Sequence, residues 1–113
     1  MPISYINLKK LDDFEIAKLK TLVERESKKI MRPKHKLENA NLVVNVKTKN
    51  VEGAKKLYQV ILKLDAPGTP KGLFDVSHED WEMERAVHRV FANLKTIVLH
   101  RLRVKRGGGF KDV

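Results

Sequence analysis

The feature that most constrains the fold is a change of hydrophobic period along the chain. In the first third, Ile16, Leu19, Leu22, Val23 and Ile30 recur close to every 3.6 residues, the spacing of one helix face. Later segments alternate apolar and polar residues, and the last third returns to helical spacing. The chain is therefore expected to combine two amphipathic helices with a sheet.

The first helix has recognisable start and stop signals. Asp12 and Glu15 stand at the spacing of a capping box, and Leu11 and Ile16 flank the cap as a hydrophobic staple would. Pro33 disfavours helical geometry in the residue before it. These signals predict a helix over residues 13–31.

Strands are predicted where side chains alternate between two faces. Leu42, Val44 and Val46 share one face of such a segment. A turn with one glycine separates it from the next strand, and a loop rich in proline and glycine follows that strand. The predicted strands span residues 3–8, 41–48, 57–64 and 73–76, and the face away from the apolar residues carries Asn45, Lys47, Gln59 and Lys63.

A second helix is predicted over residues 79–104. Ser77 is its expected N-cap, and Glu79 and Asp80 suit the positive end of the helix dipole. The glycines at 107–109 are expected to end it, with residues 107–113 forming a flexible basic tail. Its apolar stripe consists of Met83, Val87, Val90, Phe91, Leu94, Ile97, Val98 and Leu102.

The element order is therefore β-α-β-β-β-α. This order predicts an α+β two-layer sandwich, in which both helices pack on one face of a four-stranded, mostly antiparallel sheet, as in double-stranded RNA-binding domains. With 113 residues, the chain is expected to hold one domain over residues 1–106.

Aromatic residues are few. Trp81, Phe14 and Phe91 are each expected in the core, because large aromatic side chains more often close a core than stack on bases. The predicted polar sheet face carries few aromatics, which favours recognition of a nucleic-acid backbone and shape over base stacking.

Charge is concentrated in two segments. The chain has 24 Lys and Arg against 14 Asp and Glu, a net charge of +10, and such an excess on a short chain points to a polyanionic partner. Residues 18–36 hold eight basic and two acidic residues, and residues 101–112 hold five basic and one acidic residue. Both segments lie in the C-terminal halves of the predicted helices. Dipole compensation explains two or three cations per helix, and the surplus is expected to meet phosphates.

Several kinds of chemistry have no support. The chain has no cysteine, which excludes disulfides and thiolate metal sites. No two histidines stand at a metal-ligand spacing, and no phosphate-cradling glycine motif occurs. The triplet His78-Glu79-Asp80 is interpreted as a strand end running into an acidic first helical turn. Neither a signal peptide nor a membrane span is expected, because apolar runs are only a few residues long.

The chain resembles the ribosome hibernation-promoting factors. The resemblance covers roughly residues 3–106 and is carried mainly by residues 83–94, in which Ala86-Val87 and Asn93-Leu94 stand where the family's final helix has an Ala-Ile and a Lys-Leu pair. Residues 56–64 are similar to the family's middle strand. Glu82, His88 and Asn93 depart from the residues usual at their positions.

The resemblance is to the short form of the family, without its additional C-terminal domain. It implies a non-enzymatic protein that binds rRNA in the cleft of the small ribosomal subunit, overlaps the path of mRNA and tRNA, and inhibits translation during stress. It also implies a cytoplasmic protein, monomeric away from the ribosome, with no cofactor, metal, membrane partner or small-molecule substrate. The expected RNA-binding residues are Arg25, Lys28, Lys29, Arg32, Lys34, Arg85, Arg89, Lys95, Arg101, Arg103, Lys105 and Arg106.

Two other hypotheses about the function stay open. One is a double-stranded RNA-binding domain, although the chain has no clear Lys-Lys-x-Ala-Lys helix start. The other is an RNA-processing enzyme that uses His78 or His88, for which no sequence motif is present.

Overall fold

A computed structural model describes residues 2–31, 40–50, 56–67 and 72–107 of the chain. Residue 31 and residues 101–107 are described by their backbone alone. In chain order the elements are β1 (Ile3–Ile6), the 3-10 helix η1 (Leu8–Lys10), α1 (Asp13–Met31), β2 (Asn41–Asn50), β3 (Lys56–Asp65), β4 (Leu73–Asp80) and α2 (Met83–Gly107).

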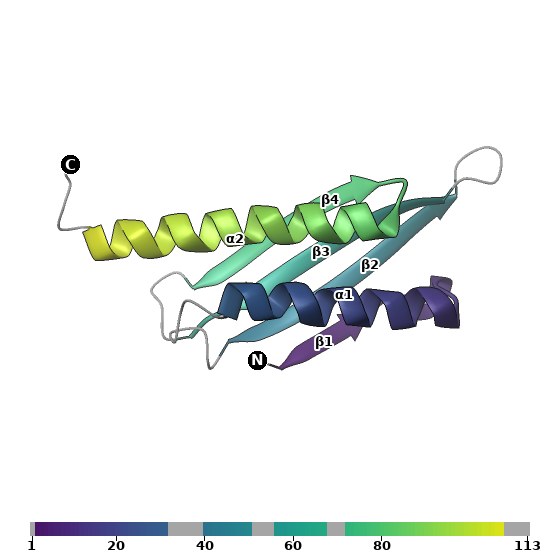
Figure 1. The fold of residues 1–113 in the computed structure, drawn as a ribbon, viewed down its shortest axis with the longest axis horizontal. Helices are drawn as coiled ribbons and strands as arrows, with labels where there is room; N and C mark the ends of the chain where they lie inside the picture. The colour runs from purple at the N-terminus through teal and green to yellow at the C-terminus, as the bar shows by residue number, and fades with distance from the viewer. Residues whose placement is uncertain (1, 32–39, 51–55, 68–71, 108–113) are drawn as a thin grey trace.

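The strands form one sheet in the order β1-β2-β3-β4. β1 pairs parallel to β2, and the other two pairs are antiparallel. Both helices cover the same face of the sheet, lie side by side and begin at the same end of it (Figure 1). The predicted α+β two-layer sandwich is confirmed, and its common helix direction gathers the two helix starts at one end and the basic C-terminal halves toward the other.

The core lies between the helices and one face of the sheet. Phe74 from β4 and Phe91 from α2 are among its largest fully buried side chains, which confirms the prediction for Phe91. The strands alternate as predicted, so their other face carries Asn45, Lys47, Gln59 and Lys63, together with partly exposed aliphatic side chains.

The start of α1 is as predicted. The backbone N–H of Asp12 donates to Oε1 of Glu15 at 3.0 Å, and the N–H of Glu15 donates to Oδ1 of Asp12 at 2.7 Å. This reciprocal pair is a capping box, which satisfies two backbone donors at the helix start. Leu11 is buried and Ile16 packs against the core, so α1 enters the molecule at a fixed position.

The first strand is shorter than predicted, and residues 7–8 do not belong to it. Asn7 adopts a left-handed conformation with φ of 63°, which Asn tolerates better than most residues, and η1 follows. The Asn7 side chain donates from Nδ2 to Oδ1 of Asn45 on β2 at 2.8 Å. This turn away from the sheet ends β1 at Ile6.

The last strand is longer than predicted, and α2 begins later. Ser77 is not a helix cap; it lies within β4 and pairs with Ile61 of β3. His78 and Asp80 take the inward positions that follow Phe74 and Val76. The apolar alternation therefore stops at Val76, although the strand itself continues to Asp80. The predicted start at residue 79 is therefore wrong by four residues.

Two aromatic predictions are wrong. Trp81 is 51% exposed and Phe14 is 75% exposed. Trp81 lies in the turn between β4 and α2, outside both packed elements. Phe14 precedes the buried Leu19 by five residues, which rotates it about 140° away from the buried stripe of α1.

At its C-terminal end, α2 extends to Gly107, three residues beyond the predicted end. The predicted tail beyond Gly107 and the stop at Pro33 lie outside the described residues.

Candidate nucleic-acid interface

Three of the predicted cations lie on the solvent side of α1. The apolar stripe of this helix packs onto the sheet, so Leu22, Val23 and Ile30 are buried. Arg25, Lys28 and Lys29 fall between these positions and are exposed. Periodicity alone therefore explains why the basic half of α1 faces solvent.

Three further predicted cations lie on the solvent side of α2. Ala86, Val90 and Leu94 are buried against the sheet or α1, and Arg85, Arg89 and Lys95 are exposed. The two helices thus place cations on the outer side of the same layer.

A buried carboxylate joins the two helices beneath these cations. Glu26 of α1 has a side chain only 11% exposed, and its Oε2 lies 3.3 Å from Nδ1 of His88 on α2. The same oxygen lies 3.2 Å from Nζ of Lys29. Since Arg25 adjoins Glu26 in the sequence and Arg89 adjoins His88, this contact brings the basic turns of both helices together. Exposed cations gathered on the outer side of one helix pair favour an anionic partner.

The charge along the helix pair changes from balanced to basic. Near the start of both helices, Nζ of Lys18 lies 3.5 Å from Oε1 of Glu84. Lys29 repeats the position of Lys18 about three turns on, and Lys95 repeats the position of Glu84 about three turns on. The facing positions on the two helices therefore carry opposite charges at Lys18 and Glu84, and positive charges on both helices at Lys29 and Lys95.

The cations differ in whether an acid already neutralises them. Arg85 lies 3.6 Å from Asp80 and 3.3 Å from Glu82, and Lys29 is paired with Glu26. Among the side chains that the structure describes, Arg25, Lys28, Arg89 and Lys95 form no ion pair with a carboxylate. We define the cationic helix surface as Arg25, Lys28, Lys29, Arg89 and Lys95.

The remaining predicted contacts are not brought into this surface by the structure. Arg32 and Lys34 lie outside the described residues. Arg101, Arg103, Lys105 and Arg106 lie on the last two turns of α2, where only the backbone is described. Arg85 sits at the opposite, acid-rich end of α2.

Sequence reasoning missed two residues that organise this surface. Lys18 was counted with the basic segment but not as a site residue, and His88 was considered as a departure from the family pattern and as a catalytic candidate, not as a contact between the helices. The recurrence of lysine eleven residues after Lys18 signals a common stripe on α1. No sequence signal pairs His88 with Glu26, because the contact depends on how two distant helices pack.

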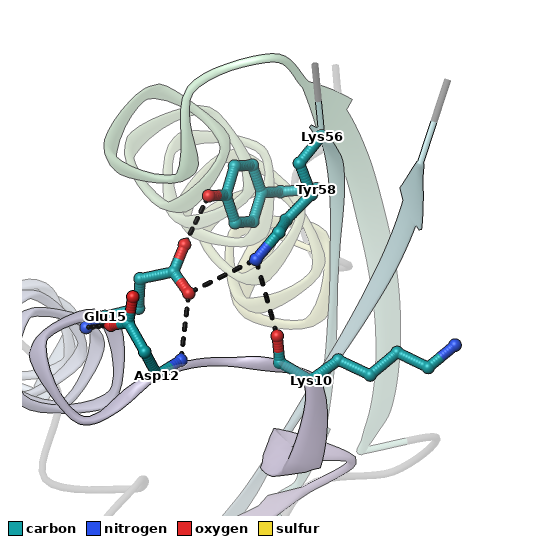
Figure 2. A network of polar contacts seen from close by, with 5 residues as sticks. All are labelled: Lys10, Asp12, Glu15, Lys56 and Tyr58. Carbon is teal, nitrogen blue, oxygen red and sulfur yellow. Dashed lines mark hydrogen bonds and ion pairs between the residues drawn. The ribbon is translucent and has the colours of Figure 1, made fainter. Parts of the chain in front are cut away.

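A second polar cluster lies where η1, α1 and β3 meet, near the start of the helices (Figure 2). The hydroxyl of Tyr58 donates to Oε2 of Glu15, and Nζ of Lys56 lies 3.3 Å from Oε1 of the same carboxylate. Lys56 also donates to the carbonyl oxygen of Lys10 at 3.4 Å. Glu15 therefore serves both the capping box of α1 and the link to the sheet.

The cluster shifts the pKa of two groups in opposite directions. Partial burial raises the pKa of the Tyr58 hydroxyl, and the hydrogen bond to Glu15 and its charge raise it further, to about 12. Partial burial also acts to raise the pKa of Glu15. The hydrogen bonds from Tyr58, Asp12 and Lys56, with the positive charge of Lys56, outweigh that effect and lower the pKa overall.

The histidines considered for catalysis are held by single carboxylates. Nε2 of His78 lies 3.9 Å from Oδ2 of Asp80, and His88 contacts Glu26. In the described ranges, no three His, Asp or Glu side chains converge as metal ligands. No helix among those residues is long and apolar enough to cross a membrane.

Comparison with known proteins finds similarity to solved structures. No family model and no curated protein sequence matches the chain. The crystal structure of the Protein Y N-terminal domain from Thermus thermophilus is similar, with a TM-score of 0.57 and 20% sequence identity over 86% of this chain and 91% of that one. A ribosomal subunit interface protein from Coxiella burnetii is similar with a TM-score of 0.60 and 14% identity, over 94% of this chain and 99% of that one.

Both of these proteins are members of the hibernation-promoting factor family. The similarity extends over most of the chain. The resemblance predicted from the sequence is thus confirmed in structure: this chain has the fold of the ribosome hibernation-promoting factors.

Proposed function

We propose that this protein binds the small ribosomal subunit through the phosphates of its rRNA and inhibits translation. In this proposal the protein occupies the channel of mRNA and tRNA, in the cytoplasm, and needs no catalytic step. The cationic helix surface meets the rRNA, and the cations on the last turns of α2, Arg32 and Lys34 extend the contact.

One observation carries the proposal. Two helices joined at Glu26 and His88 expose Arg25, Lys28, Arg89 and Lys95, and none of these four has a carboxylate partner in the described residues. Exposed cations held on a rigid scaffold release counterions when they meet a phosphate backbone, which supplies affinity without base recognition. The sheet face away from the helices, here called the open sheet face, has few aromatic side chains, and this scarcity agrees with recognition of the backbone.

The comparisons support the ribosome as the partner. The Coxiella protein is described as a ribosomal subunit interface protein, and it aligns with almost the whole of this chain. This likeness favours a ribosomal partner over a plain RNA duplex, which the charge pattern alone does not distinguish.

Cosedimentation with purified ribosomal subunits tests the proposal. At low salt we expect the protein to migrate with small subunits in a sucrose gradient and to reduce translation in a cell-free assay. The double variant Arg25→Glu/Arg89→Glu should remain at the top of the gradient. Its charge-matched control, Lys47→Glu/Lys63→Glu on the open sheet face, should still migrate with the subunits.

Three results would contradict the proposal. The wild-type protein could stay at the top of the gradient at low salt. It could bind a plain RNA duplex as tightly as the small subunit, which would favour the double-stranded RNA-binding domain. It could cleave RNA on long incubation with divalent metal, a reaction that the loss of His78 or His88 should then abolish.

A further inference from the structure

A pocket of about 470 Å³ lies at the end of the molecule where both helices begin. Phe14 of α1 and Trp81, just before α2, line this pocket together with Tyr58 of β3. The helix starts and the sheet therefore converge on one concavity, away from the basic C-terminal halves of the helices.

The exposure of Phe14 and Trp81 to water carries a free-energy cost, and packing within the described part of this chain does not offset it. Phe14 is 75% exposed and Trp81 is 51% exposed, and neither belongs to the hydrophobic core. Large apolar side chains gathered in a concavity with a polar rim are typical of a binding surface. Trp and Tyr also supply much contact area with little loss of conformational entropy.

Four carboxylates and one lysine, Lys18, line the pocket, an acidic excess on a chain whose net charge is +10. Capping and the helix dipole account for Asp12 and Glu15. They do not account for Glu82, which precedes the helix, has a side chain 65% exposed and lies 3.3 Å from Nη2 of Arg85 on the next turn. Its exposed neighbour Glu84 is paired only with Lys18 at 3.5 Å, across the gap between α1 and α2.

The wall of the pocket is held in place before any ligand arrives. Tyr58 is fixed by its hydrogen bond to Glu15, and Lys56 binds the other oxygen of that carboxylate (Figure 2). The capping box fixes the backbone that carries Phe14. A preorganised wall lowers the entropy lost on binding.

We propose that this acidic aromatic pocket binds an arginine-bearing basic segment of a partner protein. A guanidinium group stacks on the face of Trp81 or Phe14, and Glu82 and Glu84 accept its hydrogen bonds in exchange for their exposed pairs with Arg85 and Lys18. The acidic rim repels phosphate, so the pocket selects against RNA although its aromatics suit base stacking. Charge complementarity therefore commits the site to a cationic peptide.

This site is separate from the proposed rRNA surface. Arg89 and Lys95 follow Met83 by six and twelve residues, a rise of about 9 and 18 Å along α2, so the cationic helix surface begins beyond the pocket. None of the five residues that define the cationic helix surface lines the pocket. The inference goes beyond the proposed function and does not depend on it, because it is tested without ribosomes.

Trp81 is the only tryptophan of the chain, so its fluorescence reports directly on the pocket. The purified protein is titrated, at about 0.15 M salt to screen its net charge, with a blocked peptide of alternating glycine and arginine. We expect a saturable change in Trp81 emission. A peptide of the same length with glutamine in place of arginine, and a single-stranded uridine oligonucleotide, should give no such change.

Two variants and one control locate the binding. Glu82→Gln/Glu84→Gln should weaken peptide binding about fivefold, through the loss of two exposed charge contacts. Phe14→Ala should weaken it while keeping the reporter. The control Asp75→Asn/Glu79→Gln removes two charges on the outer face of β4 and should leave affinity unchanged. Circular dichroism verifies that each variant is folded.

Several outcomes would overturn the inference. One is the absence of any saturable response to the arginine peptide. Another is equal weakening by the pocket variants and the control, which would mean that only overall charge matters. A response to the uridine oligonucleotide that Phe14→Ala removes would assign the pocket to RNA instead.

Discussion

The imidazole Nδ1 of His88 on α2 lies 3.3 Å from Oε2 of Glu26 on α1, and this contact joins the two helices. The Glu26 side chain is 11% exposed, whereas that of His88 is 47% exposed. A mostly buried carboxylate needs compensation for the water it has lost, and His88 and Lys29 supply it. The contact therefore has a structural role beneath the cationic helix surface.

A double-mutant cycle measures this contact. We expect Glu26→Gln and His88→Ala to couple by about 0.5–1 kcal/mol in the free energy of unfolding, because a partly buried pair exceeds the worth of an exposed one. Urea unfolding at pH 6 provides the measurement. Lys29→Gln in place of His88→Ala should couple more weakly with Glu26→Gln, since Lys29 and Glu26 form an i,i+3 pair within one helix and such pairs contribute only about 0.3–0.5 kcal/mol. Additive effects of Glu26→Gln and His88→Ala would contradict the structural role.

The start of α2 depends on Asp80 rather than on Ser77. Oδ1 of Asp80 accepts a hydrogen bond from the N–H of Glu82 at 3.0 Å and lies 3.6 Å from Arg85. Asp80→Ala should lower the free energy of unfolding by about 1 kcal/mol, and Ser77→Ala should change it by less than about 0.5 kcal/mol. Thermal and urea unfolding of both variants check this. A larger loss in Ser77→Ala would restore the cap predicted from the sequence.

The sequence predicts the parts of the fold that depend on local patterns. The bounds of α1 follow from its stripe and from the reciprocal bonds of Asp12 and Glu15, which involve residues three apart. The border between β4 and α2 is not local in this way. Residues 77–80 stay extended because β3 pairs with them as far as Tyr58, and a partner strand is not visible in the residues themselves.

The same distinction applies to the site. That Arg25 and Arg89 face solvent follows from the helical stripes alone. That the helical turns carrying them lie side by side depends on the Glu26–His88 contact, which joins residues far apart in the chain. Trp81 and Phe14 were expected in the core on general preference, and the pocket they line forms only when both helix starts meet β3.

The pKa of Tyr58 predicts a loss of stability in strong base. In the unfolded chain the hydroxyl ionises near its ordinary pKa of 10.0, and in the folded protein burial and Glu15 raise that pKa to about 12. Because the folded pKa is the higher one, the stabilising contribution is complete below pH 10 and is lost as the pH rises from 10 to about 12. Urea midpoints measured at intervals between pH 9 and pH 12 follow this loss.

The two tyrosines of the chain provide a matched pair of variants for this measurement. Tyr58→Phe removes the hydrogen bond to Glu15, so it should lower stability by about 1 kcal/mol at pH 8 and flatten the alkaline loss. The Tyr5 hydroxyl is buried with no hydrogen-bond partner among the described residues. Tyr5→Phe should therefore leave stability at pH 8 nearly unchanged and keep the Tyr58 part of the loss. Equal effects of the two variants at pH 8 would contradict the role of the Glu15 bond.

The salt dependence of subunit binding separates phosphate contact from other roles of the cationic helix surface. Each cation that meets a phosphate contributes about 0.7–0.9 to the slope of log affinity against log salt concentration. Arg25→Gln/Arg89→Gln should therefore lower the affinity for small subunits and reduce that slope by about 1.5, if both meet phosphates. Filter binding between about 0.05 and 0.2 M salt gives both quantities. The control Lys47→Gln/Lys63→Gln removes the same charge from the open sheet face and should leave the slope unchanged. A lower affinity with an unchanged slope would mean that Arg25 and Arg89 bind something other than phosphate, and equal slopes for both double variants would mean that only the overall charge of the protein matters.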